Sequence, residues 1–590
     1  MDKPTKIFEI CEFSLNKFNK KDLISGKENG IWKKYSAKEY DNLSNLISYG
    51  LINLGINKGD KISIISSNRV EWSIVDMGIS KIGGVNAPIY PNITSKDYEY
   101  IIRDAGSKVV FAGSLEIYNK INHLVQKIDT LDHIFSFDQI DNCRNWREIL
   151  DIGKKNPKHD QMKKNQEQIK SSDLFTLIYT SGTTGNPKGV MLSHDNLFGQ
   201  FYGLGEYLPL YSSDRAISFL PLCHVFERVV EYYYILNGVS IYYAESIDKL
   251  GDNLKEISPS IMCTVPRLLE KLYDKIISKG EDLTGFKKKL FFWAVNLGLQ
   301  HELYGKNGFW YEFKLKIANK LIFKKWREAL GGNLRYVFSG AAALQTRLAK
   351  VFTAANIPVY EGYGLSETSP VISANTIKGR GKCYGSVGKI MPGIKVKFSD
   401  EGEILCKGHN VMMGYFNKPE LTSQVLDKDG WFSTGDVGMM IEDNFLKITD
   451  RKKEIFKTSG GLYIEPQVME NVFKESKFIE QIMVIGEGEK MPGAFIVPDF
   501  NFLNTWCKAN NIDLSKVNDL NSNNLIMNAF QTDVDDLNTR FASYKRIKKF
   551  KLMNSSWSIE TEELTATMKL RRKIIISKYS EDYSYVYKKK

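Results

Sequence analysis

The chain has 590 residues, of which 43% are hydrophobic and 25% charged, and its formal net charge is +12. A chain of this length is expected to divide into domains, and its composition excludes an intrinsically disordered protein. Lysine is spread along the whole chain instead of being concentrated on one basic element, which argues against a nucleic-acid-binding protein.

The first residues and the cysteines bear on where the protein acts. Met1 to Lys6 lacks the apolar core of a secretory signal, and no apolar run reaches the roughly 20 residues that a spanning helix needs. The seven cysteines are scattered, with neither a disulfide rhythm nor a metal-binding pair. We therefore expect buried, reduced thiols in a cytoplasmic protein.

Short apolar runs alternate with helical patterns between residues 60 and 112, where strands are expected at 61–65 and 108–111 and a helix at 72–79. The same rhythm returns at 216–219, 239–243, 261–265 and 335–338. Strands that alternate with helices predict an α/β fold, with mixed or parallel sheets flanked by helices. The polar, lysine-rich stretch 153–170 is expected to be an exposed connector.

The most distinctive motif is the loop at residues 179–189, which holds three glycines, several hydroxyl side chains and Lys188 directly after an apolar stretch. Glycines let backbone N–H groups approach an oxyanion, while hydroxyls donate hydrogen bonds or ligate a metal. The loop is not a P-loop, because Gly182 and Gly185 are too close together and Gly189 follows the lysine. The loop alone indicates a polyphosphate site, although an ordinary solvated hairpin has the same composition.

Residues 286–327 combine basic and aromatic side chains with a spacing that predicts amphipathic helices. Two interpretations stay open. In the one that we favour, the aromatic face packs on the body of the protein and the lysines lie in water. In the other, the helices form a membrane-facing patch that collects a lipid substrate.

Four further blocks follow the loop, at residues 360–368, 433–436, 450–454 and 563–569. In this order, the set resembles the adenylate-forming superfamily of acyl-CoA synthetases, luciferases and peptide-synthetase adenylation domains. The resemblance spans nearly the whole chain. It implies a large N-terminal adenylation domain (residues 1–450) with a helical insertion at about 280–330, and a small mobile α+β domain (residues 451–590).

The resemblance implies that a carboxylic acid reacts with ATP to give an acyl-adenylate, which is then passed to CoA. In this family the loop binds the phosphates of ATP, here through Thr180, Ser181, Gly182, Thr183, Thr184, Gly185 and Lys188. Mg²⁺ is then held by a loop hydroxyl, Thr184 or its neighbour, and by Glu367. This sparse set of oxygen ligands suits magnesium, although Glu367 alone could be a helix-capping acid.

The resemblance also assigns the nucleoside site. Tyr363 stacks on adenine, Asp436 accepts hydrogen bonds from both ribose hydroxyls, and Arg451 assists; the alternative for Asp436 is a turn acid after a glycine. Gly340 and Ala341 line the base. The remaining candidates belong to the same segment as Tyr363: Glu361, Gly362, Gly364 and Thr368.

Lys569 resembles the lysine of the family's C-terminal domain that reaches the carboxylate and the α-phosphate during adenylation, a task suited to a compact charge on a long stem. Ala566 stands where the family usually has proline, which removes a local restraint. For the second step, the resemblance implies that the C-terminal domain rotates about Lys453. Gly460 and Gly461 would then face the pantetheine of CoA.

The segment 220–228 resembles that of long-chain fatty acid CoA ligases, which implies a long-chain fatty acid as substrate, with peripheral membrane contact as an option. His224 then lies between the ATP site and the acyl tunnel, although a lone histidine is more often a satisfied core residue. Val225 stands where amino-acid-activating relatives have aspartate, so an amino acid would bury an unpaired charge. Other open alternatives are a short-chain or aromatic acid, an acyl-carrier-protein ligase, and a non-enzymatic binding protein, which intact Lys569, Glu367 and Asp436 disfavour.

Overall fold

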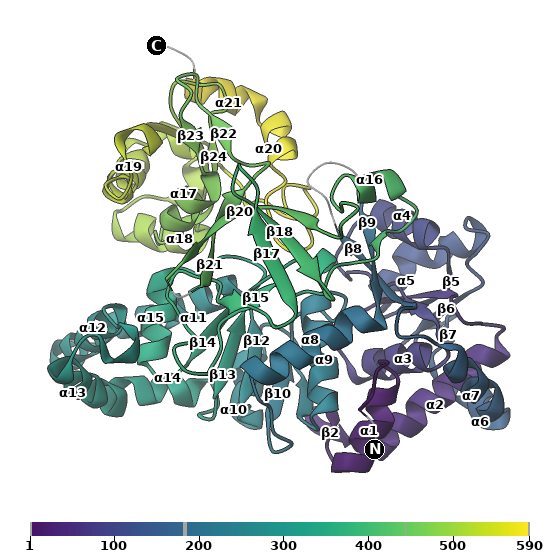
Figure 1. Cartoon of the computed structure of the whole chain (residues 1–590). Coiled ribbons are helices and arrows are strands. Elements are labelled where there is room, and N and C mark those ends of the chain that lie inside the picture. Colours follow the sequence, from purple (N-terminus) through teal and green to yellow (C-terminus); the bar gives the residue numbers. More distant parts are fainter. Residues whose placement is uncertain (1–2, 181–185, 443, 588–590) are drawn as a thin grey trace.

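The computed structural model describes residues 3–180, 186–442 and 444–587 (Figure 1). Two large sheets form most of the body. The first has eight described strands, in spatial order β19 (Gly414–Tyr415), β9 (Lys188–Ser193), β8 (Leu174–Thr180), β4 (Val85–Asn86), β3 (Lys61–Ile65), β5 (Ser107–Ala112), β6 (His133–Ser136) and β7 (Arg144–Asn145). Its centre is parallel, whereas β8, β9 and β19 pair antiparallel.

The second sheet contains β17 (Ile394–Phe398), β18 (Glu403–Gly408), β20 (Phe432–Ile441), β21 (Phe445–Arg451), β16 (Lys389–Ile390), β15 (Ser373–Ala374), β14 (Val359–Tyr363), β13 (Tyr336–Ser339), β12 (Ile261–Thr264), β10 (Arg215–Ser218), β11 (Ser240–Tyr243), β1 (Ile24–Glu28) and β2 (Ile31–Tyr35). Strands β10 to β14 pair in parallel, and the pairing becomes antiparallel from β15 onward. The sheet therefore joins a helix-covered parallel half to an antiparallel half. Along the chain, the last strand of the antiparallel half is β21, which ends at Arg451.

Helices cover these sheets: α1 (Glu9–Phe18), α2 (Ala37–Asn53), α3 (Val70–Lys81), α4 (Ser95–Ala105), α5 (Leu115–Ile121), α6 (Arg147–Lys155), α7 (His159–Gln168), α8 (His194–Tyr207), α9 (Val225–Leu236), α10 (Leu250–Ile257), α11 (Pro266–Glu281), α12 (Gly285–Leu299), α13 (Phe309–Ala318), α14 (Lys324–Ala329), α15 (Thr346–Ala354) and α16 (Pro419–Ser423). Nearly every residue of α3 is buried, since the helix lies inside the main core. The α/β prediction is confirmed, and so are the expected strands and the helix at 72–79.

The stretch 153–170 was expected to be a connector, and this prediction is wrong because α7 occupies most of it. The helix buries only Met162 and Asn165. Met162 and the following Ile169 pack in the main core. A helix that is attached through so few apolar side chains has too weak a hydrophobic period to be recognised from the sequence.

The C-terminal unit lies above the body in Figure 1 and has its own sheets. Its elements are β22 (Phe456–Lys457), β23 (Tyr463–Ile464), α17 (Pro466–Phe473), β24 (Ile479–Ile485), β25 (Gly493–Pro498), α18 (Phe500–Ala509), α19 (Asn524–Asn538), β26 (Lys549–Leu552), α20 (Arg572–Lys578) and α21 (Ser580–Tyr587). Two hydrophobic clusters cover opposite faces of the β24-β25-β26 sheet. Ion pairs join the unit to the body, among them Lys477–Glu281 at 2.5 Å and Arg267–Glu480 at 3.5 Å.

The helical insertion packs on the body through only part of its aromatic side chains. Phe291, Phe323 and Trp326 are buried, and the Trp326 ring contacts the rings of both phenylalanines. Phe286 of α12 and Phe309, Trp310 and Phe313 of α13 are exposed instead, so the interpretation that we favoured accounts for one face of the insertion and is wrong for the other.

Five of the seven cysteines are buried, all seven are free thiols, and Cys143 and Cys383 are only partly covered, contrary to expectation. Within the described ranges, no helix is both long and apolar enough to cross a membrane.

Candidate active site

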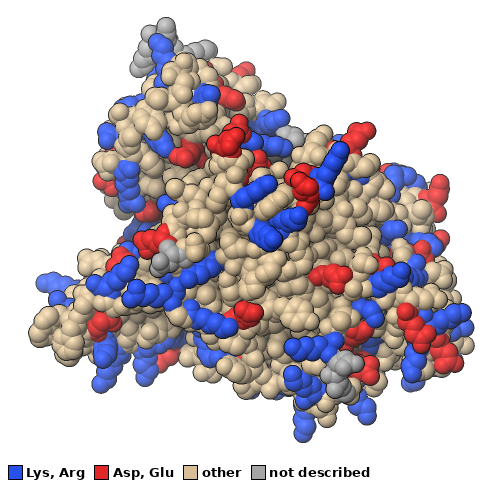
Figure 2. All heavy atoms as spheres, viewed as in Figure 1, with Lys and Arg blue, Asp and Glu red and all other residues tan. Residues whose placement is uncertain are grey.

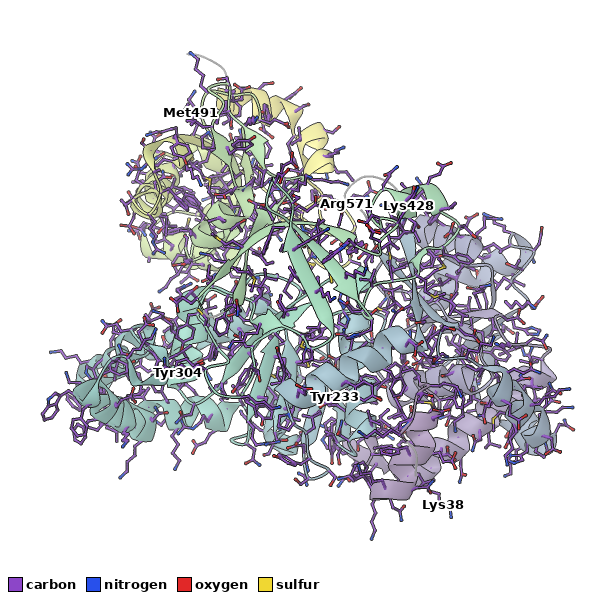
Figure 3. The ribbon with its side chains drawn as sticks, in the orientation of Figure 1. Lys38, Tyr233, Tyr304, Lys428, Met491 and Arg571 are labelled. Carbon is purple, nitrogen blue, oxygen red and sulfur yellow. The ribbon has the colours of Figure 1, made fainter. Side chains whose placement is uncertain are left out.

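A cavity of about 1730 Å³ lies where the C-terminal unit meets the body. Its walls come from β8, β9, α8, α9, the ends of β13 and β14, β20 and the loop before α20. Tyr233 on α9 and Arg571 on that loop, both labelled in Figure 3, are among the lining residues. The volume exceeds the roughly 300–1,000 Å³ of a pocket for one small ligand, so the cavity has room for more than one reactant.

Asp436 and Arg451 occupy paired positions on β20 and β21. Arg451 Nε lies 3.3 Å from Asp436 Oδ1, and the Tyr363 hydroxyl donates to Asp436 Oδ2 at 2.8 Å. Burial raises the pKa of the Asp436 carboxyl, and Arg451 and Tyr363 offset part of that shift. All three residues line the cavity, which places a carboxylate, a guanidinium and an aromatic ring together.

The candidates for the adenine pocket lie on the neighbouring strands. Gly340 and Ala341, directly after β13, line the cavity, and so do Glu361, Gly362 and Gly364. Burial raises the pKa of Glu361 to about 8, against the opposing charge of Lys382. The Glu361 carboxyl can therefore stay protonated near neutral pH and act as a hydrogen-bond donor.

Thr368 does not belong to this lining. Its hydroxyl accepts from the Leu365 N–H at 2.9 Å and donates to the Pro370 carbonyl at 3.1 Å, and the side chain is completely buried. Thr368 therefore shapes the loop that carries Glu367 instead of reaching a ligand.

The ends of the phosphate loop open into the same cavity. Thr180 and Lys188 pair across β8 and β9, and both line the cavity. The Lys188 ammonium lies 4.9 Å from the centre of the Tyr415 ring. Burial and the nearby Lys453 lower the pKa of Lys188. Ser181, Gly182, Thr183, Thr184 and Gly185, which were predicted to bind phosphate or metal, lie outside the described residues.

Glu367 faces the cavity beside Lys188. The Tyr415 hydroxyl donates to Glu367 Oε1 at 2.9 Å, which orients the carboxylate. A single oriented carboxylate next to the loop that is predicted to bind phosphate fits Mg²⁺, since this ion takes one or two protein oxygens and fills its other positions with phosphate and water. Tyr415 belongs to no recognisable motif, and sequence reasoning missed it.

Lys569 is carried by a tight hairpin. The Thr565 N–H donates to the Lys569 carbonyl at 2.9 Å, and the Lys569 N–H donates to Thr565 Oγ1 at 3.1 Å. These bonds close the loop around Ala566, so the ring of a proline is not needed to form it. The Lys569 side chain is exposed to the cavity, where the surrounding protein and the Arg451 charge lower its pKa to about 8.

His224 is the N-cap residue of α9, and its Nδ1 accepts from the Phe226 N–H at 3.1 Å. Burial and the Lys569 charge lower the pKa of His224 to about 4, so the imidazole is neutral near pH 7. His224 thus caps a helix and also lines the cavity. Beyond it the lining is largely apolar and comes from α8, α9 and adjacent strand ends: Leu204, Leu208, Phe219, Val229, Val230, Tyr234 and Val265.

The residues that were predicted to take part in the CoA step lie apart from one another in the structure. Lys453, in the turn after β21, lines the cavity. Gly460 and Gly461 lie in the exposed turn between β22 and β23 and are not part of the cavity lining. The molecule therefore presents Lys569 to the cavity and holds these two glycines away from it.

Asn375 is a lining residue that the sequence did not single out. Its N–H donates to the Glu361 carbonyl at 2.8 Å and its side chain is completely buried. Neither atom of the side-chain amide has a hydrogen-bond partner among the described residues. A buried amide without partners costs stability, which is a common property of binding residues.

Comparison with known proteins agrees with this geometry. The AMP-binding enzyme family matches residues 13–416, and the C-terminal domain of AMP-binding enzymes matches residues 454–590. The chain belongs to the AMP-binding enzyme family and is an adenylate-forming ligase, which confirms the resemblance seen in the sequence.

Relatives cover almost the whole chain. Long-chain-fatty-acid–CoA ligase FadD15 of Mycobacterium bovis is 31% identical over 574 residues, which is 95% of this chain and 93% of the relative. ACSBG2 of Xenopus laevis, also a long-chain-fatty-acid–CoA ligase, is 30% identical and covers 99% of this chain and 84% of its own. The crystal structure of the anthranilate CoA ligase AuaEII with anthranoyl-AMP superposes with a TM-score of 0.72 at 20% identity, over 98% of each chain.

Proposed function

We propose that this ligase activates a long-chain fatty acid with ATP to an acyl-adenylate and then transfers the acyl group to CoA, releasing pyrophosphate and AMP. The observation that carries the proposal is one continuous cavity, which joins the Asp436, Glu367 and Lys569 side chains to an apolar wall formed by α8 and α9. Two relatives named as long-chain ligases, at 31% and 30% identity, support it.

In the first step a carboxylate oxygen attacks the α-phosphorus of ATP, and the bond to pyrophosphate breaks. Asp436 orients the ribose by accepting from its hydroxyls, and Lys569 neutralises the charge that accumulates where the carboxylate meets the phosphate. Glu367 and Thr184 would hold Mg²⁺, which supplies further charge neutralisation on the phosphates when it is bound.

In the second step the sulfur of CoA attacks the acyl carbonyl, the bond to AMP breaks, and the thiol proton passes to solvent or base. We propose that the domains 1–450 and 451–590 change their relative orientation between the two steps, about Lys453. The exposed position of Gly460 and Gly461 is compatible with this idea, because a rotation could bring their turn to the cavity.

The apolar wall indicates the substrate class. Each buried methylene of an acyl chain can contribute about 0.8 kcal/mol, so a wall of leucine, valine and aromatic side chains favours a long chain. The buried Val225 near neutral His224 offers no carboxylate to an amino-acid ammonium group. Free cysteines that are mostly buried agree with action in the reducing cytoplasm.

The test is AMP release by the full chain with ATP, magnesium and CoA across a ladder of acids from acetate to oleate, with benzoate and amino acids alongside. We expect turnover to rise from acetate to palmitate. The Lys569→Ala variant, carried through the same ladder, shows that the signal belongs to this protein. A preference for acetate, benzoate or an amino acid, or acyl transfer to a carrier protein in place of CoA, would refute the proposal.

A further inference from the structure

The second face of the helical insertion carries exposed apolar side chains. Phe309, Trp310, Phe313, Ile317 and Leu321 follow one side of α13 and of the π-helical turn Asn319–Phe323. Phe309 is 76% exposed and Trp310 is 73% exposed. These five residues form what we call the insertion patch, and Phe286 at the start of α12 is a further exposed aromatic residue of the insertion, at 77%.

The opposite side of α13 is already occupied. Leu315 and Ala318 are buried against the body, in the same core cluster as Trp326. A surface helix that packs through one face normally has polar residues on the other. The insertion patch is therefore not needed to attach the insertion, and an apolar face with no packing role indicates a binding surface.

Lysines surround the insertion patch. Between residues 284 and 325 the sequence has nine lysines and two glutamates. The lysines are exposed, and Figure 2 shows basic side chains around this end of the molecule. Lys314, Lys316 and Lys320, on the helix that carries the patch, form no ion pair with any residue in the described part of the chain.

A surface that is both apolar and strongly basic has few suitable partners. A second copy of this chain would bring two lysine-rich surfaces together, and a nucleic acid would leave Ile317 and Leu321 without apolar contacts. An anionic bilayer satisfies both features, because aromatic rings enter the headgroup region while lysine stems reach the lipid phosphates. We propose that the insertion patch docks this protein onto the surface of an anionic lipid bilayer.

The insertion patch is distinct from the cavity. The first turn of α11 lines the cavity, and the other end of this 16-residue helix leads into α12. A helix of this length spans about 24 Å. Docking through the patch therefore leaves the walls of the cavity uncovered. The docking surface is also independent of which acid the enzyme activates.

Vesicle flotation of the full-length protein tests the proposal. We expect the protein to float with vesicles of phosphatidylcholine and phosphatidylglycerol, and to remain in solution with vesicles of phosphatidylcholine alone. The double variant Trp310→Ser with Phe313→Ser, and separately Lys316→Gln with Lys320→Gln, should each weaken binding to the anionic vesicles by about tenfold or more. These side chains are exposed, so both variants should fold, which the melting temperature checks.

Matched controls come from other surfaces of the chain. Ile31→Ser removes an exposed apolar side chain on β2, and Lys163→Gln with Lys164→Gln removes two exposed charges on α7. Both should bind the anionic vesicles as the unmodified protein does. Equal binding to both vesicle types, or full binding by the Trp310→Ser and Phe313→Ser variant, would overturn the proposal. So would lipid-independent self-association that this variant abolishes, since the patch would then be a contact between copies.

Discussion

Asp436 and Arg451 face each other from paired positions on β20 and β21, with 3.3 Å between Arg451 Nε and Asp436 Oδ1. Residues that are directly opposite on antiparallel strands carry their side chains on the same face, so the sheet itself sets this ion pair. Tyr363 approaches the other carboxylate oxygen from β14. The carboxylate is therefore held in one orientation before any nucleotide arrives.

The first prediction concerns this carboxylate. Asp436→Asn keeps its size but removes the charge and one acceptor, so we expect the KM for ATP to rise by about 10- to 100-fold, as for loss of a hydrogen bond to a charged group. The KM for the acid should change little. Steady-state kinetics with each substrate varied in turn measure both values. Asp400→Asn, at an exposed carboxylate, is the control. An unaltered KM for ATP would contradict the ribose assignment.

The second prediction concerns the metal. Glu367→Gln and Thr184→Val should each reduce turnover by ~10²–10³, the usual effect of losing one preorganised charge-stabilising group. Raising the magnesium concentration should restore part of the lost rate. The control is Tyr415→Phe, which removes only the hydrogen bond to Glu367 and should have a smaller effect. Near-normal rates for Glu367→Gln and Thr184→Val at every magnesium concentration, limiting ones included, would exclude both residues as ligands.

Much of this site could be predicted because its residues lie in short contiguous blocks. Asp436, Arg451, Glu367 and Lys569, which come from separate blocks, all line one cavity. A block marks a segment without showing which way each side chain points. Thr368 therefore passed as a ligand-binding residue although it is buried in its own loop.

The residues that the sequence analysis missed do not lie in such contiguous blocks. Tyr415 and Asn375 reach the site through long-range pairing, since β19 joins β9 and Asn375 follows the short strand β15. A single asparagine after an apolar run has the appearance of a turn residue in sequence. Only the complete burial of its unpartnered amide distinguishes it.

The third prediction follows from that burial. Asn375→Leu replaces an unpaired amide with an apolar side chain of similar size, so we expect the melting temperature to stay the same or rise. We also expect kcat/KM to fall by about tenfold or more, because Asn375 lines the cavity and the substitution removes the polar group of its side chain. Thermal unfolding and kinetics on the same preparation measure the two effects. A more stable protein with full activity would show that the amide has no role in binding.

The fourth prediction uses the pKa of Lys569, which the surrounding protein and the Arg451 charge lower to about 8. The lysine is charged below its pKa, and in the mechanism that we propose the adenylation step needs that charge. The kcat/KM for acyl-AMP formation should therefore be constant from neutral pH up to the pKa and decrease as the pH rises through about 8. Lys569→Arg keeps its charge at every accessible pH, so its own lower activity should not decrease in this range. A decrease of the same shape in both proteins would assign the pH dependence to another group.

The last prediction separates the two half-reactions. Lys569→Ala should lower acyl-AMP formation by ~10²–10³ yet leave thioester formation from preformed acyl-AMP largely intact, because the charge is needed only where carboxylate and α-phosphate meet. Lys453→Pro should do the reverse, since proline fixes φ at the residue that we propose as the pivot of the C-terminal domain. Pyrophosphate release and loss of free thiol follow the two steps.

Lys453→Ala is the matched control for the hinge, because Lys453 lines the cavity and its charge lies near Lys188. If Lys453→Ala slows thioester formation as much as Lys453→Pro does, the lost charge explains the effect and backbone freedom does not.

Ion pairs such as Lys477–Glu281 and Arg267–Glu480 join the two units in the orientation seen here and must break on rotation. Lys477→Gln should therefore leave adenylation unchanged and leave thioester formation equal or faster. If Lys569→Ala and Lys453→Pro instead lose both steps equally and melt at lower temperature, both residues support the fold, and a single conformation serves both steps.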